Sequence, residues 1–327
     1  MSIQTPSAIS NHRLQSTGFF ALAMMGAYLG TSAIASVFIT FFPNSEHTES
    51  LMTIFLYLLG FFIPCLIYGL IIRSRTGQRL TDTLSMHRLP FASVLICIFL
   101  GFLIQPPTSL IAQASSMVFQ DITSISVTSQ VASIPLWEML LTTALMPALF
   151  EEILCRGILY DGCKNCPVWY QLLIPACFFG FLHMNFQQIS YALPMGIFMA
   201  FILYVTGSIF STMIIHFTLN GTQVACAWLN ENLGWFEGNN KVGTVFITIV
   251  GGSENIRITA LIAGIALVLI GLMVFLLFRI HQPAKREKRQ IYAGWHEGGW
   301  ILGLIIGFLF VCALLIELLL PYISLFE

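Results

Sequence analysis

Residues 136–160 read LWEMLLTTALMPALFEEILCRGILY. The run is long enough to cross a hydrocarbon layer of about 30 Å as a helix, which takes ~20 mainly apolar residues. Its second half nevertheless carries the charged residues Glu151, Glu152 and Arg156. A charge at the centre of a bilayer costs at least ~2.5–3.5 kcal/mol, so charged residues in such a position are typically functional. The stretch therefore predicts a membrane-spanning helix and marks the place where a functional site is expected.

The composition of the whole chain also indicates a membrane protein. Of its 327 residues, 57% are hydrophobic and only 9% are charged, whereas soluble domains are about 25% charged. So few charges cannot coat a water-facing surface, which excludes a soluble globular enzyme. The high apolar content excludes a disordered chain. The formal net charge of −1 excludes a nucleic-acid-binding protein, because such a protein needs a basic face.

Eight further apolar runs lie before and after this stretch. Together with it they predict an all-α polytopic bundle of about nine transmembrane spans. The expected spans are 17–42, 51–73, 90–113, 136–160, 168–187, 188–206, 208–229, 257–280 and 299–320. The connections near 187–188 and 206–208 are the shortest, so the sequence defines these boundaries least well.

The distribution of lysine and arginine predicts the orientation of the bundle. With nine alternating spans, the basic clusters in 73–88 and 279–289 fall on one side together with Arg13 and Lys164. Only two basic residues fall in the loops on the other side. Because cytoplasmic loops are enriched in Lys and Arg, the N-terminus is expected in the cytoplasm. Short loops and the lack of a targeting signal favour a bacterial plasma membrane.

Cys163 and Cys166 form a C-x-x-C in the expected cytoplasmic loop after the fourth span. Such a pair can be half of a zinc site or a redox pair, but no second pair accompanies it. Most of the other cysteines lie in expected spans, where cysteine behaves as a small hydrophobic residue. A structural role is therefore expected for the C-x-x-C as well.

The ionisable residues inside the membrane are concentrated in three expected spans. Besides those of 136–160, these are His183 in the fifth span and His216 in the seventh, with Asn220 one turn after His216. At a helix rise of about 1.5 Å per residue, Glu151, His183, His216 and Asn220 lie at overlapping depths. We therefore expect them to meet in one site that holds water.

The spacing along each helix predicts separate roles. Glu152 and Arg156 are four residues apart with the acid first, which favours an ion pair on one helix face. Glu151 points about 100° away from Glu152 and can face another neighbour. His216 and Asn220 are also four residues apart and share a face of their own helix. The Glu152–Arg156 pair is expected to be structural, and the remaining residues to carry the chemistry.

Two kinds of hydrolytic chemistry fit these residues. In the first, Glu151 takes a proton from water and His183 shares that water. His216 and Asn220 then donate hydrogen bonds to the developing oxyanion. In the second, Glu151, His183 and His216 hold one divalent metal ion such as Zn²⁺, which activates the water. The H-E-x-x-H pattern of many zinc proteases is absent, and spacing alone leaves both alternatives open.

Three short motifs lie in this region in a fixed order. E-E-x-x-x-R is present at 151–156 as EEILCR, F-x-x-x-H at 179–183 as FGFLH, and H-x-x-x-N at 216–220 as HFTLN. Each motif is weak alone, but all three on separate spans are a strong signal. Over roughly 136–229 the chain resembles the CAAX-protease and bacteriocin-processing membrane proteases, the CPBP or Abi family. Phe179, the first residue of the second motif, is expected to support the site.

The resemblance implies an intramembrane endopeptidase, in a family whose eukaryotic branch removes the last three residues of prenylated CAAX proteins. Glu151 then resembles the water-activating base, and His183 resembles its assistant. His216 and Asn220 resemble the oxyanion-side pair, and Arg156 a structural partner of the motif glutamates. The family is usually labelled metalloprotease, although a glutamate mechanism without metal has also been argued for it.

The motifs divide the chain into three expected segments. Residues 1–135 hold three spans and an outer loop, 136–229 form a four-helix catalytic core, and 230–327 hold an outer loop and the last two spans. The expected partners are membrane lipid and a peptide or protein substrate. The leading prediction is an endopeptidase that cleaves membrane-associated peptides or proteins from a cavity open toward the cytoplasm or the lipid.

Two other functions are compatible with the same residues. A non-catalytic membrane scaffold or bacteriocin-immunity protein would bind a peptide in the same cavity without cleaving it. A proton-coupled transporter would use the buried Glu and His residues as a relay. The sequence shows no evident internal repeat, a feature of many transporters, which counts against the transporter.

Overall fold

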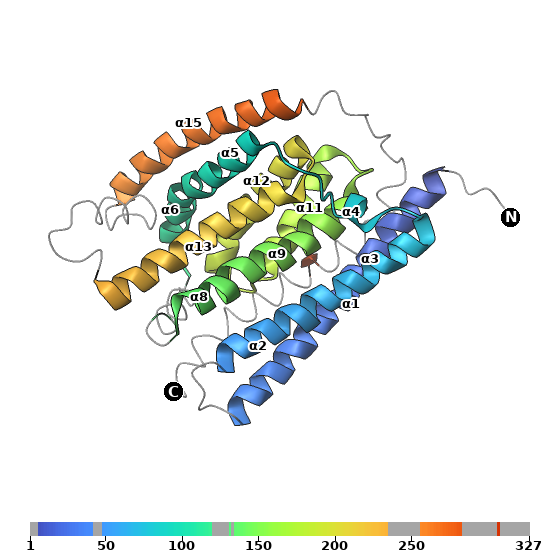
Figure 1. Cartoon of the computed structure of the whole chain (residues 1–327), viewed down its shortest axis with the longest axis horizontal. Coiled ribbons are helices and arrows are strands. Elements are labelled where there is room, and N and C mark those ends of the chain that lie inside the picture. Colours follow the sequence, from blue (N-terminus) through green and yellow to red (C-terminus); the bar gives the residue numbers. More distant parts are fainter. Residues whose placement is uncertain are drawn as a thin grey trace.

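The computed structural model of the chain describes residues 6–41, 48–119, 131, 134–234, 256–282 and 306–307. Within these ranges the chain forms helices joined by turns, and no strand is present (Figure 1). This confirms the prediction of an all-α protein. The expected ninth span, 299–320, lies outside the described residues except for 306–307.

An N-terminal hairpin forms one side of the molecule. Its elements are α1 (Pro6–Phe41), α2 (Thr48–Leu56), the π-helix η1 (Tyr57–Phe62), α3 (Ile63–Thr76) and the short α4 (Leu80–Thr83). α1 packs against η1 and α3, and the rings of Phe20 and Tyr68 stack at 4.2 Å between their centroids. The hairpin thus has its own apolar seam.

The central layer consists of the helices that carry the three motifs. Residues 136–163 form one unbroken helical stretch of α8 (Leu136–Met139), η2 (Leu140–Leu145), α9 (Met146–Glu152), η3 (Ile153–Leu159) and α10 (Tyr160–Cys163). α11 (Val168–Phe181), α12 (Phe186–Thr206) and α13 (Ile209–Leu233) follow. η2 and η3 are π-helical, a geometry that is frequent at functional sites, and no feature of the sequence predicted it.

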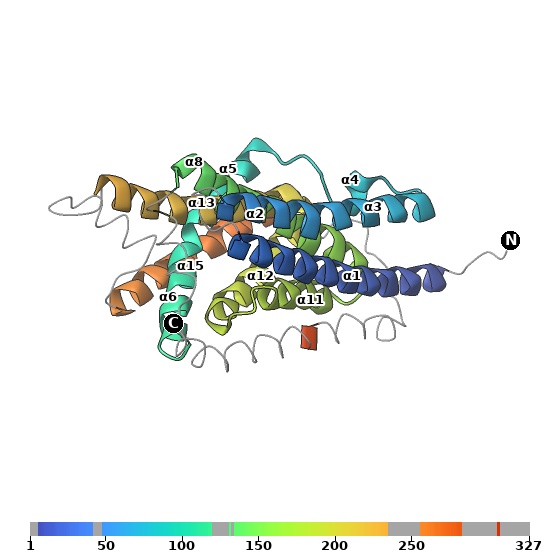
Figure 2. The ribbon, with the colours of Figure 1, turned by 90° about the horizontal axis from the view of Figure 1, so that it is seen from below.

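Three helices cover the other side of the central layer. α5 (Phe91–Leu103) and α6 (Gln105–Ser116) replace the single helix expected over 90–113, and α15 (Ile256–His281) packs against both (Figures 1 and 2). The helix is interrupted at Ile104 because the two prolines that follow Gln105 lack a backbone N–H. The motif helices therefore lie between the hairpin and these three helices.

Five helical stretches of the described residues are long and apolar enough to cross a membrane. They are Ser16–Ile34, Ser50–Thr76, Phe91–Ser116, Phe186–Thr206 and Ile256–His281. The stretch 136–163 and α13 are not among them, because charged or polar side chains of the motifs interrupt their apolar character. The chain is thus a multi-pass membrane protein, and the count of nine spans stays a prediction.

The helix expected over 168–187 ends earlier in the structure. α11 stops at Phe181 after 14 residues, short of the ~20 residues that a span needs. The chain then turns, with Met184 at a positive φ of 50°, and the Asn185 side chain accepts a hydrogen bond from the amide of Gln188 to begin α12. His183 consequently lies in the turn between two helices and not inside a helix.

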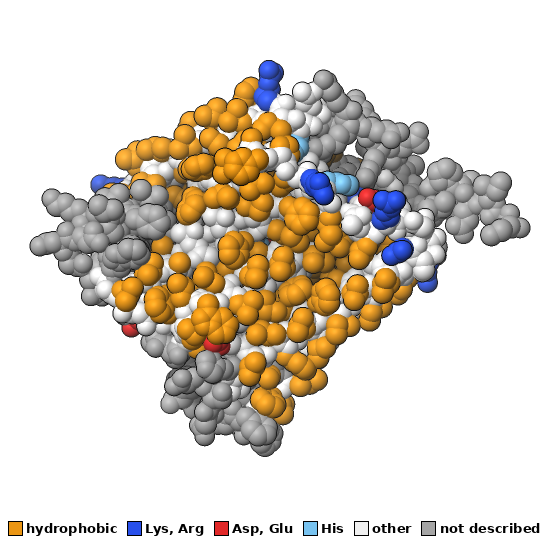
Figure 3. All heavy atoms as spheres, in the orientation of Figure 1, with side chains coloured by type: hydrophobic (Ala, Val, Ile, Leu, Met, Phe, Trp, Pro, Cys, Tyr) orange, Lys and Arg blue, Asp and Glu red, His pale blue; other side chains and the backbone are white. Residues whose placement is uncertain are grey.

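The surface agrees with a membrane environment. The face drawn in Figure 3 is covered mainly by hydrophobic side chains, and most of its Lys and Arg side chains gather at one edge, near α4. Large apolar side chains are exposed on the helices of both outer sides, for example Ile67 on α3 and Val268 on α15. Such surfaces are stable in lipid, where apolar side chains need no cover.

Candidate active site

An ion pair buried within the central layer joins two residues of the first motif. Arg156 Nη1 donates to Glu152 Oε1 at 2.9 Å, and both side chains are 0% exposed. Arg156 Nη2 also donates to the backbone carbonyl of Gly196 on α12 at 3.2 Å. A Cβ at Gly196 would lie 2.9 Å from Ala176 Cα of α11, so glycine is required for this close approach. The pairing expected from the i,i+4 spacing is present and ties η3 to α12.

The third motif meets the first at the same carboxylate. His216 of α13 places Nδ1 2.9 Å from Glu152 Oε1, and the imidazole is buried. A carboxylate can only accept, so Nδ1–H donates. Glu152 thereby contacts two positive or proton-bearing groups on different helices. The sequence placed His216 with Glu151, and the structure places it with Glu152.

The ring of Phe179 connects all three motifs. The Arg156 guanidinium lies over it, with Cζ 4.5 Å from the ring centroid. The imidazoles of His183 and His216 meet it edge-on, with centroids 5.2 and 5.8 Å away. A cation above an aromatic face is worth up to about 2 kcal/mol where water is excluded. One side chain of the second motif thus contacts residues of the first, second and third motifs.

His183 is oriented by its own helix end. Its Nδ1 lies 2.8 Å from the carbonyl oxygen of Phe179, which can only accept, so Nδ1 carries the proton. In the neutral ring Nε2 then holds the free lone pair. Because His183 sits in the turn after α11 and is only partly buried, this nitrogen is suited to bind a proton of water.

Glu151 has a different environment from its neighbour Glu152. It is partly exposed, and its Oε1 accepts a hydrogen bond of 2.9 Å from the hydroxyl of Tyr57 in η1. The ring of Tyr57 stacks near Phe150, with centroids 6.0 Å apart. Tyr57 was missed by sequence reasoning, because a tyrosine in an apolar run looks like any packing residue.

Asn220 contacts a π-helix of the central layer. Its Nδ2 donates to the carbonyl oxygen of Thr143 in η2 at 3.1 Å. His216 and Asn220 share a side of α13 as expected, but in this conformation they bond to different partners, Glu152 and Thr143. The structure thus gathers Glu152, Arg156, His216 and the second motif at one point, with Glu151 and Asn220 at the margin.

The expected metal ligands Glu151, His183 and His216 do not form a common site in the described residues. Within them, no group of three or more His, Cys, Asp or Glu side chains lies close enough together to hold an ion. Of the expected set Glu151, His183 and His216, the first is bonded to Tyr57 and the last to Glu152. This arrangement of the described residues does not fit the ligand set of a divalent metal.

The C-x-x-C lies at the turn between α10 and α11 and is buried. The amide of Cys166 donates to the carbonyl of Cys163 at 2.9 Å, and Gln171 Nε2 donates to the carbonyl of Cys166 at 2.7 Å. Burial raises the pKa of the Cys166 thiol to about 12. A thiol with this pKa stays protonated near neutral pH and is a poor nucleophile and metal ligand. These contacts favour the structural role.

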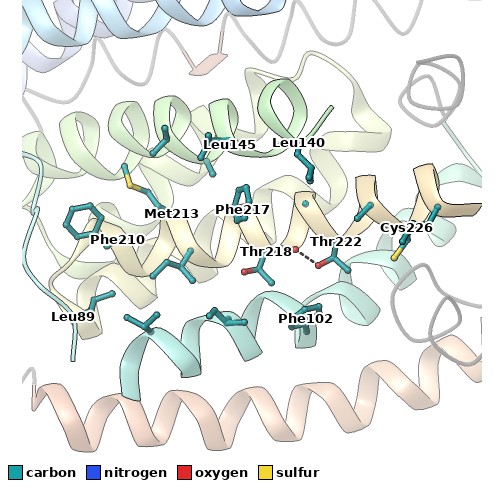
Figure 4. Close-up of a pocket in the computed structure, with 18 of the residues that line it drawn as sticks. Leu89, Phe102, Leu140, Leu145, Phe210, Met213, Phe217, Thr218, Thr222 and Cys226 are labelled. Carbon is teal, nitrogen blue, oxygen red and sulfur yellow. Dashed lines mark hydrogen bonds between the residues drawn. The ribbon is translucent and has the colours of Figure 1, made fainter. Parts of the chain in front are cut away.

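A separate apolar cavity of about 1380 Å³ lies between α5, η2–α9 and α13. Figure 4 shows Phe210, Met213 and Phe217 of α13 along its wall, opposite Leu145 of η2. None of the predicted site residues lines it. His216 precedes Phe217 by one residue and therefore points about 100° away from it. α13 thus presents mainly apolar residues to the cavity, together with Thr218 and Thr222, and turns His216 toward the motif cluster.

The segment that contains the three motifs is similar to a known protein family. Residues 133–222 match the family model described as type II CAAX prenyl endopeptidase Rce1-like. No curated protein and no solved structure matches the chain. The matched segment contains all three motifs, which meet at Phe179. The match confirms the resemblance predicted from the motifs: residues 133–222 are similar to the Rce1-like type II CAAX prenyl endopeptidases, a family of peptidases.

Proposed function

We propose that the protein is an intramembrane endopeptidase that hydrolyses membrane-associated peptides or proteins with water activated by Glu151 and His183. The observation that carries the proposal is the meeting of all three motifs around Phe179, with Arg156, His183 and His216 in contact with its ring. Residues far apart in sequence are thereby held at one point of a membrane protein.

Glu151 is the proposed general base. Of the two motif glutamates it is the partly exposed one, and within the described residues it forms no ion pair comparable to that of Glu152. Its carboxylate would take a proton from a water molecule while His183 Nε2 accepts that water's second hydrogen bond. General-base assistance of this kind typically contributes 10²–10⁴-fold to a rate. The resulting hydroxide adds to the carbonyl carbon of the scissile peptide bond.

His216 and Asn220 are the proposed donors to the oxyanion that forms. With Nδ1 held by the Glu152 carboxylate, the proposed donor to the substrate oxygen is Nε2–H, which is present when both ring nitrogens carry a proton. Asn220 would exchange its bond to the Thr143 carbonyl for one to the same oxygen. Collapse of the tetrahedral intermediate then transfers a proton from Glu151 to the leaving amine, which returns the carboxylate to its starting state.

Glu152 and Arg156 have a positioning role in this proposal. A carboxylate that bonds the Nδ1 of a histidine fixes the orientation and the proton position of the ring. Arg156 balances the charge of that carboxylate inside the apolar layer. The pair thus holds His216 without taking part in proton transfer.

The topology proposed with this function has nine spans, a cytoplasmic N-terminus and a place in a bacterial plasma membrane. In this proposed topology the basic loop 73–88 lies on the cytoplasmic side, and cleavage is proposed to occur on that side. Single cysteines added to that loop and to 230–256 of a cysteine-free chain test the topology. A membrane-impermeant maleimide applied to intact cells should label only 230–256, and the reverse pattern would contradict it.

The substrate and the catalytic role are tested together by comparing cells. Membrane peptides are collected from cells that carry the wild-type chain, Glu151→Gln or the matched control Glu231→Gln, which changes an exposed glutamate at the end of α13. Peptides present with wild type and control but absent with Glu151→Gln identify the substrates. Identical peptides in all three, together with an unchanged phenotype of the cells, would instead favour the non-catalytic scaffold or immunity protein.

A further inference from the structure

We propose that Tyr57 is a positioning residue for the Glu151 carboxylate, contributed by a part of the chain outside the family-matched residues 133–222. The inference rests on the proposed function of Glu151. It assigns to the N-terminal hairpin a share in the chemistry of the site, beyond packing against it.

The contact is direct and geometrically normal. Tyr57 Oη donates to Glu151 Oε1 over 2.9 Å, within the range of a good O–H···O hydrogen bond. One oxygen of the carboxylate is thereby occupied, and in the proposed mechanism the other takes the proton of the water. A hydrogen bond to a charged acceptor is about twice as strong as one between neutral groups. The hydroxyl therefore fixes which way the carboxylate faces.

The ring that bears this hydroxyl contacts two other aromatic rings. Phe150, next to Glu151 in the chain, stacks on it with centroids 6.0 Å apart. Phe61 lies against it in a tilted arrangement, with centroids 5.3 Å apart. Since Phe150 and Glu151 belong to α9, one aromatic contact and one hydrogen bond together fasten Tyr57 to the helix of the first motif.

The backbone of the hairpin places Tyr57 at this position. Tyr57 is the first residue of the π-helix η1, whose wider turns change the direction of the side chains relative to an α-helix. A Cβ at Gly60 would lie 2.9 Å from Thr31 Oγ1, so glycine allows α1 to approach η1 closely. The Thr31 hydroxyl is itself fixed by bonds to the carbonyls of Ala27 and Tyr28. α1 thus packs closely against η1 and helps to fix its position.

The kinetic test is Tyr57→Phe in purified protein in lipid vesicles, with a peptide substrate identified as above. Loss of one hydrogen bond to a charged group should lower kcat about ten-fold and leave KM unchanged. The matched control is Tyr68→Phe on the same helical stretch, which removes a buried hydroxyl bonded to Thr17 at 2.9 Å and should retain wild-type kcat. Equal kcat in Tyr57→Phe and wild type, or an equal loss in the control, would overturn the inference.

The outcomes separate this inference from the proposed function. If Glu151→Gln is inactive and Tyr57→Phe is fully active, only the role of Tyr57 is refuted. If Glu151→Gln is active, the proposed function is refuted, and the inference about Tyr57, which rests on it, is refuted as well.

A measurement that needs no activity tests the contact itself. Thermal unfolding of Tyr57→Phe, Glu151→Gln and the double variant forms a double-mutant cycle. Non-additive changes in Tm support the bond, and strictly additive changes contradict it.

Discussion

The two adjacent glutamates of the first motif lie in contrasting surroundings. Glu152 is 0% exposed and is held by Arg156 and His216 at 2.9 Å each. Glu151 is partly exposed and accepts a hydrogen bond from the hydroxyl of Tyr57. A fully buried carboxylate enclosed by two cationic or proton-bearing groups is suited to fix a structure, whereas a partly exposed one can still be reached by water. Glu152 therefore has the structural role, together with Arg156 and His216, and Glu151 has the proposed catalytic role.

The largest effect on stability is expected from breaking the buried Glu152–Arg156 ion pair. Arg156→Ala leaves the Glu152 carboxylate buried without its main counter-charge, which typically costs about 3–5 kcal/mol of folding free energy. Thermal unfolding in detergent should show a large fall in Tm, accompanied by loss of cleavage. The matched control Arg257→Ala, at the start of α15 and outside the motif helices, should unfold near wild type. A wild-type Tm for Arg156→Ala would show that the pair does not hold the central layer.

The next largest effect is expected on the cleavage rate when His183 is removed, because it is proposed to bind the same water as Glu151. His183→Ala should lower kcat about 100-fold, because a positioned acid–base group contributes 10²–10⁴-fold. Its Tm should stay close to wild type, since the imidazole lies in a turn and is only partly buried. His87→Ala, at an exposed position in the irregular segment between α4 and α5, serves as the control in the same assay. Equal rates for His183→Ala and the control would remove His183 from the mechanism.

The smallest effect is expected from removal of metal ions. The described residues bring no three metal-binding side chains together, and Glu151 is bonded to Tyr57 rather than to His183 or His216. Dialysis against a strong chelator should therefore leave the cleavage rate unchanged. Loss of the rate on chelation, with recovery on adding back zinc and no other metal, would make Glu151 a ligand and not a base.

The sequence predicted the helical class, the Glu152–Arg156 pair and the resemblance of residues 133–222 to a peptidase family, because each depends on spacing along one chain segment. It did not predict the bond between His216 and Glu152, because the rotation of α13 against α9 depends on packing between helices. The turn at His183 was also missed, since no glycine or proline lies in 182–185 to mark it. Met184 adopts a positive φ of 50° there, a conformation more typical of glycine or asparagine.

The separate cavity beside α13 also lay beyond sequence reasoning. The expectation was one cavity that holds the motif residues, and the cavity of about 1380 Å³ instead faces the apolar side of the helix. Periodicity identifies Met213 and Phe217 as sharing a face, but it cannot tell whether that face meets another helix or an open space. The packing of α5 against α13 decides this, and it depends on residues more than a hundred positions apart.

The most direct test of the account compares Glu151→Gln with wild type in purified form in lipid vesicles, with cleavage and thermal unfolding measured on the same samples. The account predicts that Glu151→Gln keeps a Tm close to wild type and loses at least about 100-fold in cleavage rate. Cleavage by folded Glu151→Gln at the wild-type rate would contradict it.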